Sequence, residues 1–187
     1  MSTELLGFVL AFLYLGLLLE FAPRSRDRLL KHISVYWPAA IACLTFNFLI
    51  AGLVPNAPGY AVTAMNVFGW CASLMMCAAL RSFRAPLTRR LKLWLVFGVI
   101  AAALVFDVIR QLGSSYYVIR ATYSTCIYAA SSFWLIVETR SIQRIHKSSQ
   151  LQITLAIATL IFLMLVGRVI LLVLSDINSL EHVHQEN

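Results

Sequence analysis

Six runs of apolar residues dominate this sequence. Each run is long enough, or nearly so, to cross a lipid bilayer as a helix. A membrane-spanning helix needs about 20 mostly apolar residues, since it rises about 1.5 Å per residue through a hydrocarbon core about 30 Å thick. The runs cover residues 5–22, 33–53, 60–80, 91–112, 117–137 and 151–174. The sequence therefore predicts an all-α fold, a polytopic membrane helix bundle with six transmembrane helices, followed by a short polar tail over residues 175–187.

The composition agrees with residence in lipid rather than in water. Hydrophobic residues make up 60% of the 187 residues and charged residues only 12%, whereas a typical soluble domain carries about 25% charged residues. The connectors between the runs are short, and none has room for a second domain. The sequence thus excludes a catalytic domain outside the membrane.

The basic residues are distributed asymmetrically over the connectors. Twelve of the 15 lysines and arginines lie in or beside the first, third and fifth connectors, and the N-terminus, the other two connectors and the tail hold none. These are Arg24, Arg26, Arg28, Lys31, Arg81, Arg84, Arg89, Arg90, Lys92, Arg140, Arg144 and Lys147. Since short cytoplasmic loops are enriched in lysine and arginine, both termini are predicted on the extracytoplasmic side of a bacterial inner membrane. We therefore attribute the net charge of +7 to basic residues that set the topology and contact anionic lipid headgroups, not to nucleic-acid binding.

No motif in the sequence points to catalysis, a cofactor or a metal. The phosphate-binding GxxxxGK[ST] loop, HExxH and GxSxG are absent from the sequence. Cys43, Cys71, Cys77 and Cys126 all lie in apolar runs, so we interpret them as small core residues rather than metal ligands or disulfides. Residues 1–4 contain no basic residue, and we do not expect a cleavable signal peptide.

Three arginines lie outside the basic loops, in or beside apolar runs: Arg110, Arg120 and Arg168. Ionisable groups within a membrane are costly, and they usually face the bundle interior or a water-filled cavity. Arg168 is the deepest, about 9 Å below the outer end of its run at the helical rise per residue. Asp107 lies at a similar level on the fourth run. We predict that Asp107 and Arg168 are ionic partners or share a hydrated site, with Arg110 as the other candidate partner of Asp107.

Other polar side chains join this outer layer. Asn47 and Asn66 lie at a similar depth on the second and third runs. On the fifth run Arg120, Ser124, Tyr128 and Ser131 follow helical spacing, with Tyr123 beside them, and we expect this stripe to face inward.

Three interpretations of the outer layer remain open. Polar side chains can hold the helices together by hydrogen bonds. Alternatively, three arginines against one aspartate leave surplus positive charge, which predicts a cavity for an anionic or polar small ligand. Movement of ions or protons is the third interpretation. The residues predicted to line a ligand site are Asn47, Asn66, Asp107, Arg120, Tyr123 and Arg168.

Two further features concern packing. Small residues at four-residue spacing, Gly98 with Ala102 and Thr122 with Cys126 and Ala130, allow close approach of their helices. Glu138 lies at the inner end of the fifth run, where it can neutralise loop arginines.

The leucine-rich run 5–19 leads into Pro23-Arg24-Ser25-Arg26, and Glu138-Thr139-Arg140 leads toward the last run. With the short hairpins and arginine-rich turns, this pattern resembles the multi-pass membrane sensor regions that precede bacterial diguanylate cyclase or histidine kinase domains. The resemblance covers most of the chain but transfers no residue-specific motif. No cyclase or kinase sequence follows here, and an even number of helices would leave the C-terminus on the wrong side for a cytoplasmic effector.

Three functional hypotheses follow. The first is a non-enzymatic membrane module, a small-ligand sensing or accessory subunit with a polar outer-leaflet site. The second is a transporter or channel subunit, and the third is a structural subunit of a larger membrane complex. Each implies the lipid bilayer, and in most cases other membrane protein subunits, as partners.

Overall fold

The computed structural model describes residues 3–24, 35–53, 59–113, 116–145 and 147–185, with side chains for 5–17, 35–53, 59–113, 116–145 and 147–175. Over this part of the chain the fold is all-α, as predicted, with six helices and no strand. The helices are α1 (Thr3–Arg24), α2 (Tyr36–Leu53), α3 (Tyr60–Ser82), α4 (Arg89–Gln111), α5 (Tyr117–Gln143) and α6 (Ser149–Gln185). Each overlaps one predicted run, and residues 175–185 of the predicted tail continue α6 as helix.

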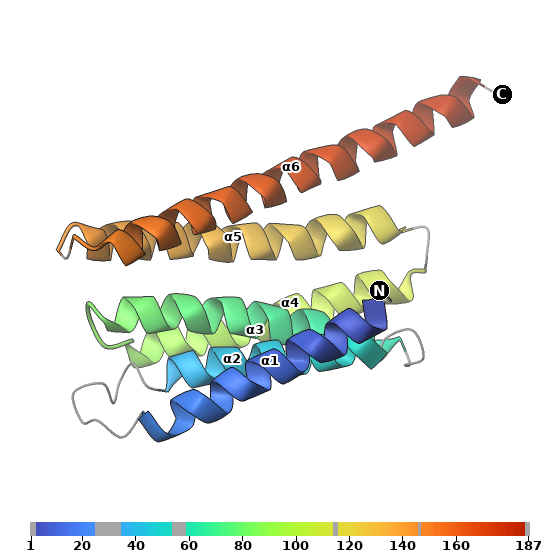
Figure 1. Cartoon of the computed structure of the whole chain (residues 1–187). Coiled ribbons are helices and arrows are strands. Elements are labelled where there is room, and N and C mark those ends of the chain that lie inside the picture. The colour runs from blue at the N-terminus through green and yellow to red at the C-terminus, as the bar shows by residue number, and fades with distance from the viewer. Residues whose placement is uncertain (1–2, 25–34, 54–58, 114–115, 146, 186–187) are drawn as a thin grey trace.

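Successive helices run in opposite directions, so that the chain passes up and down through the bundle (Figure 1). Both termini lie at one end, which we call the terminal end. The opposite end carries the connectors that follow α3 and α5, with Arg81, Arg84, Arg140 and Arg144 beside them, and we call it the basic end. The arginines and lysines of residues 25–34 lie outside the described residues.

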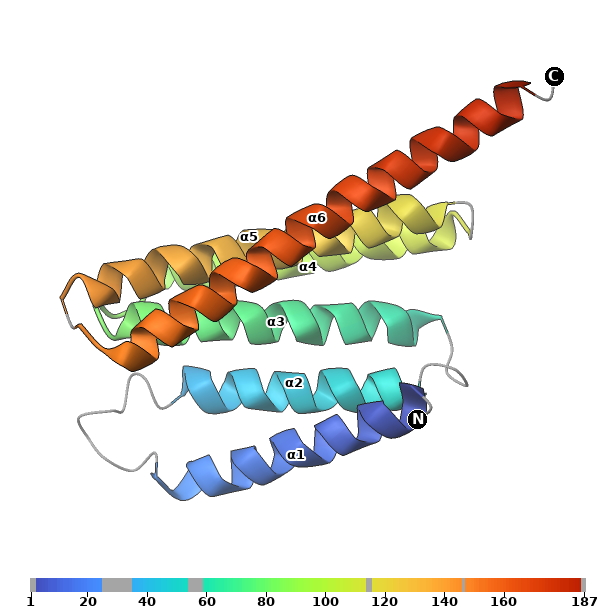
Figure 2. The same cartoon turned by 45° about the horizontal axis from the view of Figure 1, so that its top comes forward.

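The helices do not surround a single axis. α1 packs on α2, α2 on α3, α3 on α5 and α5 on α6, so these five form a row. α4 lies against both α3 and α5, with which it makes fewer contacts than the helices of the row make with one another. α6 diverges from the bundle toward the C-terminus (Figure 2). α3 is consequently the middle helix of the row, and α3 and α5 together contribute most of the buried side chains described.

Four helical segments among the described residues are long and apolar enough to cross a membrane. They are Tyr36–Leu53, Tyr60–Ser82, Arg89–Gln111 and Ser149–Ser175. Their outward side chains are large and apolar, as shown by Leu104, which is 64% exposed, and Leu171, which is 69% exposed. Soluble monomers rarely expose contiguous apolar surface of this kind. The chain is therefore a multi-pass membrane protein.

α1 and α2 approach each other closely at two glycines that the sequence pattern did not single out. A Cβ on Gly7 of α1 would lie 2.8 Å from the backbone nitrogen of Gly52 on α2. In contrast, a Cβ on Gly98 would meet no atom within 4 Å. The close approach that the sequence allows at Gly98 does not occur, because α4 sits too loosely against its neighbours for that face to touch another backbone.

An aromatic cluster fills the centre of the bundle. Trp70 of α3 and Phe106 of α4 are 1% and 2% exposed, and their rings meet edge to face with centroids 5.6 Å apart. Tyr123 of α5 meets Trp70 in the same manner at 6.3 Å. Such edge-to-face contacts stabilise aromatic pairs by about 0.5–1.5 kcal/mol beyond burial. This aromatic cluster holds α4 and α5 against α3.

Candidate functional site

A cavity of about 360 Å³ lies in the terminal half of the bundle. Its walls come from α2, α3, α4, α5 and α6, so it joins helices far apart in sequence. The lining residues are Asn47, Val62, Met65, Asn66, Phe106, Tyr117, Arg120, Ala121, Ser124, Thr125, Tyr128, Leu165 and Arg168. Small-molecule sites measure about 300–1,000 Å³, which makes this terminal-end cavity large enough for a small ligand only.

Helix α5 supplies the polar wall. Arg120, Ser124 and Tyr128 are spaced four residues apart, which places them on one face of a helix, and all three line the cavity. The predicted inward stripe is confirmed over these positions. Ser131, the last member, is also buried, and its hydroxyl donates to the carbonyl of Tyr128 within the helix.

The two asparagines brace the cavity wall. Asn47 donates to the Met65 carbonyl at 2.6 Å, which links α2 to α3. Asn66 donates to the Val62 carbonyl at 2.9 Å, and its oxygen accepts a hydrogen bond from the Ser124 hydroxyl at 2.6 Å, which links α3 to α5. Hydrogen bonds between helices of this kind stabilise membrane bundles by up to about 1–2 kcal/mol each. The asparagines therefore hold the bundle together as well as line the cavity.

The glycine at position 69 makes room for the deepest part of the polar wall. Gly69 is buried in α3, and a Cβ there would overlap the Tyr128 hydroxyl and lie 3.0 Å from the Asn47 amide nitrogen. Tyr128 and Asn47 thus reach the cavity only because α3 has no side chain between them. The sequence pattern gave no sign of this role for Gly69.

Arg120 and Arg168 bring positive charge to the cavity from α5 and α6. The guanidinium of Arg120 lies over the Tyr117 ring, 5.6 Å from its centroid, a cation–π contact that leaves its donors free. Arg168 has no hydrogen-bond or ion-pair partner among the described residues, and it is exposed within the open cavity. No acidic side chain belongs to the described lining. Two uncompensated guanidinium groups therefore face one cavity.

Asp107 does not pair with Arg168, and that part of the prediction was wrong. Its carboxylate accepts from Arg110 at 2.9 Å, from Thr63 at 2.8 Å and from Gln111 at 2.7 Å. Arg110 lies one turn further along the same helix, where side chains three residues apart meet readily. Asp107 is thereby occupied in joining α4 to α3, and it is not among the residues that line the cavity.

Tyr123 also lies outside the predicted site. Its hydroxyl donates to the Ala102 carbonyl of α4 at 3.3 Å, and its ring packs on Trp70. The predicted set is therefore split: Asn47, Asn66, Arg120 and Arg168 meet at the cavity, while Asp107 and Tyr123 serve the packing of α4.

A second charged cluster lies at the basic end. Glu138 of α5 has a side chain only 3% exposed, and it accepts from Arg81 at 2.9 Å and from Arg84 at 3.0 Å. The Trp134 indole nitrogen donates to the same carboxylate at 3.1 Å. The predicted neutralisation of loop arginines by Glu138 is confirmed, and the cluster joins the connector after α3 to α5.

No group of three histidine, cysteine or acidic side chains that could hold a metal ion occurs within the described part of the chain. No protein-family model, curated protein or solved structure matches this sequence.

Proposed function

We propose that the protein is a non-enzymatic membrane module that binds a small anionic ligand in the terminal-end cavity. The observation that carries this proposal is the charge balance: Asp107 is engaged by Arg110, so Arg120 and Arg168 have no acidic partner at the cavity among the described residues. Arginines in a membrane require acceptors. A carboxylate or phosphate group suits them, because the planar guanidinium binds either group through two parallel hydrogen bonds.

The proposal includes a topology with six membrane crossings and both termini extracytoplasmic. α5 is less apolar than the four segments named above, and α1 is described with side chains only over residues 5–17, an apolar stretch too short for that comparison. The two helices have 27 and 22 residues, lengths of about 40 and 33 Å. The polar side chains that lower the hydropathy of α5 include Glu138, Ser124 and Arg120, which contact other side chains of the bundle. In a bacterial inner membrane this orientation would open the cavity toward the outer leaflet.

A sensing or accessory role fits this arrangement and the resemblance to membrane sensor regions. The ligand would reach the cavity from outside, and α6, which carries Arg168 and packs mainly on α5, would be the helix moved by its binding. The exposed apolar faces of α4 and α6 leave surface for other membrane subunits as well as for lipid.

A structural subunit is the second candidate, and the hydrogen bonds of the polar layer favour it. The bonds from Asn47 to Met65, from Ser124 to Asn66 and from Thr63 to Asp107 each join two helices without any ligand. If the layer serves only to hold the bundle, Arg120 and Arg168 would be compensated by water or lipid headgroups.

The two candidates differ in their response to anions. The melting temperature of the purified full chain would be measured in lipid nanodiscs with phosphate, sulfate, acetate or succinate, each against chloride at equal ionic strength. We expect at least one oxyanion to raise the melting temperature of the wild type, because a ligand that binds only the folded state stabilises it. Arg168→Gln and Arg120→Gln should abolish this rise, whereas Arg144→Gln, at the basic end, should retain it. The ligand site would be contradicted if no oxyanion raised the melting temperature of the wild type. It would also be contradicted if the rise persisted in both cavity variants.

A further inference from the structure

Helix α4 leaves two apolar cavities between itself and its neighbours. One, of about 340 Å³, lies against α3 and α5, and the other, of about 360 Å³, lies between α2, α3 and α4. The second, which we call the basic-end groove, contains Lys92 and Tyr36 in an otherwise apolar lining. The remaining lining residues are Cys71, Leu74, Met75, Ala78, Leu87, Leu95, Val96, Val99 and Ile100.

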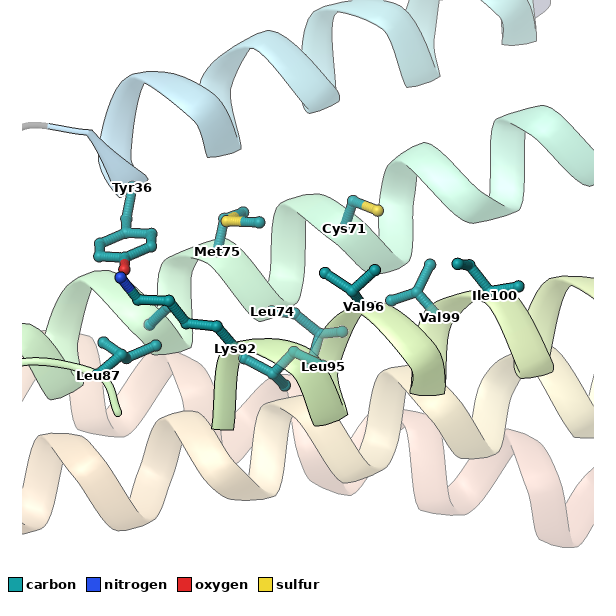
Figure 3. A pocket seen from close by; sticks show the side chains of 11 residues that line it. Tyr36, Cys71, Leu74, Met75, Leu87, Lys92, Leu95, Val96, Val99 and Ile100 are labelled. Atoms are coloured by element: carbon teal, nitrogen blue, oxygen red, sulfur yellow. The ribbon is translucent and has the colours of Figure 1, made fainter. Parts of the chain in front are cut away.

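The basic-end groove has a polar end and an apolar length. Figure 3 shows the Lys92 side chain reaching toward the Tyr36 hydroxyl at one end, with Val96, Val99 and Ile100 following along α4. From Lys92 to Ile100 the helix rises about 12 Å. One leaflet of the hydrocarbon core is about 15 Å deep, half of the core thickness. The length of the groove therefore corresponds to most of the depth of one leaflet.

The chemistry of the groove favours hydrocarbon over water. A water molecule needs two or more polar partners to occupy a cavity, and beyond Lys92 and Tyr36 the described lining offers almost none. An empty groove would lose the dispersion contacts of its walls. Because the groove lies beside α4, whose outward face is apolar along the helix, the molecules at hand to fill it are lipids.

The polar end of the groove favours a ligand with a negatively charged group. Lys92 has no carboxylate partner among the described residues, and its ammonium group carries three donors. Tyr36 adds a hydroxyl at the same end. Arg89, the first residue of α4, lies one helical turn before Lys92. A phosphate group that entered here would meet cations and a hydroxyl donor at the level where a phospholipid carries its headgroup.

We propose that the basic-end groove binds one acyl chain of an anionic phospholipid whose phosphate group is held by Lys92 and Tyr36. The site is separate from the terminal-end cavity, with which it shares no lining residue. Bound lipid would fill the space between α2 and α4, and so support the most loosely held helix of the bundle. This inference does not depend on whether the terminal-end cavity takes an anion.

Native mass spectrometry of the full chain tests the proposal. The protein is incubated with phosphatidylglycerol or with phosphatidylcholine of the same acyl chains, and the bound lipid is counted. We expect the wild type to retain one phosphatidylglycerol in preference to phosphatidylcholine. Lys92→Gln should weaken this binding about fivefold, the effect of one cation near a membrane surface. Arg90→Gln, an exposed cation at the same end that does not line the groove, should leave it unchanged.

A second variant tests the groove rather than the charge. Val99→Phe places a larger side chain in the cavity, so it should reduce retention of phosphatidylglycerol while circular dichroism shows an unchanged helix content. Equal retention of both lipids by the wild type would overturn the proposal. So would equal effects of Lys92→Gln and Arg90→Gln, unaltered binding by Val99→Phe, or a lipid-free dimer in which a second copy fills the groove.

Discussion

The hydroxyl of Tyr128 on α5 occupies the space that a side chain on Gly69 of α3 would fill. This relationship sets both the packing of the two helices and the floor of the terminal-end cavity. Gly69→Ala should therefore push Tyr128 aside and lower stability by about 1–3 kcal/mol, as overpacking of a buried site does. Thermal unfolding in nanodiscs would measure the loss.

Two further variants separate this overlap from a general effect of alanine. Gly98→Ala adds the same methyl group where nothing lies within 4 Å, so it should be neutral or slightly stabilising, since alanine favours the helix. Gly69→Ala combined with Tyr128→Phe removes the overlapping hydroxyl and should recover part of the lost stability. A double variant no more stable than Gly69→Ala alone would show that the Tyr128 hydroxyl is not the obstacle.

A second prediction concerns α1 and α2. A Cβ on Gly7 would lie 2.8 and 2.9 Å from the backbone nitrogen and Cα of Gly52, and backbone atoms cannot turn away as a side-chain end can. Gly7→Ala should force the two helices apart and lower the melting temperature. Gly16→Ala, on the same helix with nothing within 4 Å, is the matched control. If both substitutions have the same effect, the crossing of α1 and α2 does not depend on Gly7.

The positions of the helices could be predicted from the sequence, whereas the partners of their polar side chains could be predicted only in part. Apolar run length fixes where a helix can lie, and depth along each run placed Asn47, Asn66, Arg120 and Arg168 in one layer, where the structure joins them. Depth does not give the rotation of a helix about its axis. Asp107 has the right depth, but it turns toward Thr63 and pairs with Arg110.

The features that the sequence did not reveal depend on distances between helices. Gly69 and Gly98 look alike in an apolar run, yet one is covered by Tyr128 and the other faces open space. The basic-end groove is lined by residues that would suit either a core or a lipid-facing surface. Only the loose seating of α4 against α3, with Tyr36 of α2 at one end, turns them into a cavity.

A third prediction concerns topology. Alkaline phosphatase fused after Asn187 should be active, because six crossings would place the C-terminus outside the cytoplasm, opposite the basic connectors. The same enzyme fused after Ile145, in the basic connector that follows α5, should be inactive. An inactive C-terminal fusion that is nevertheless expressed would contradict the topology with six crossings and both termini outside the cytoplasm.

The last prediction is an asymmetry in the cluster at the basic end. The side chain of Glu138 is 3% exposed, while those of Arg81 and Arg84 are 43% and 40% exposed. Removing both arginines, as Arg81→Gln with Arg84→Gln, leaves a buried carboxylate whose remaining described donor is the Trp134 indole. Breaking a buried pair in this manner costs about 3–5 kcal/mol, and we expect the lower end because the lost charges are partly in solvent.

Removing the acid should cost less. Glu138→Gln keeps an acceptor for Trp134, and the two arginines can turn toward solvent, so the loss should be about 1–2 kcal/mol. Arg140→Gln, an exposed cation at the same end, serves as the control and should change stability little. Thermal unfolding followed by tryptophan fluorescence would rank the three variants. If Glu138→Gln proved the most damaging of them, the cluster would act through the carboxylate's own hydrogen bonds rather than through compensation of a buried charge.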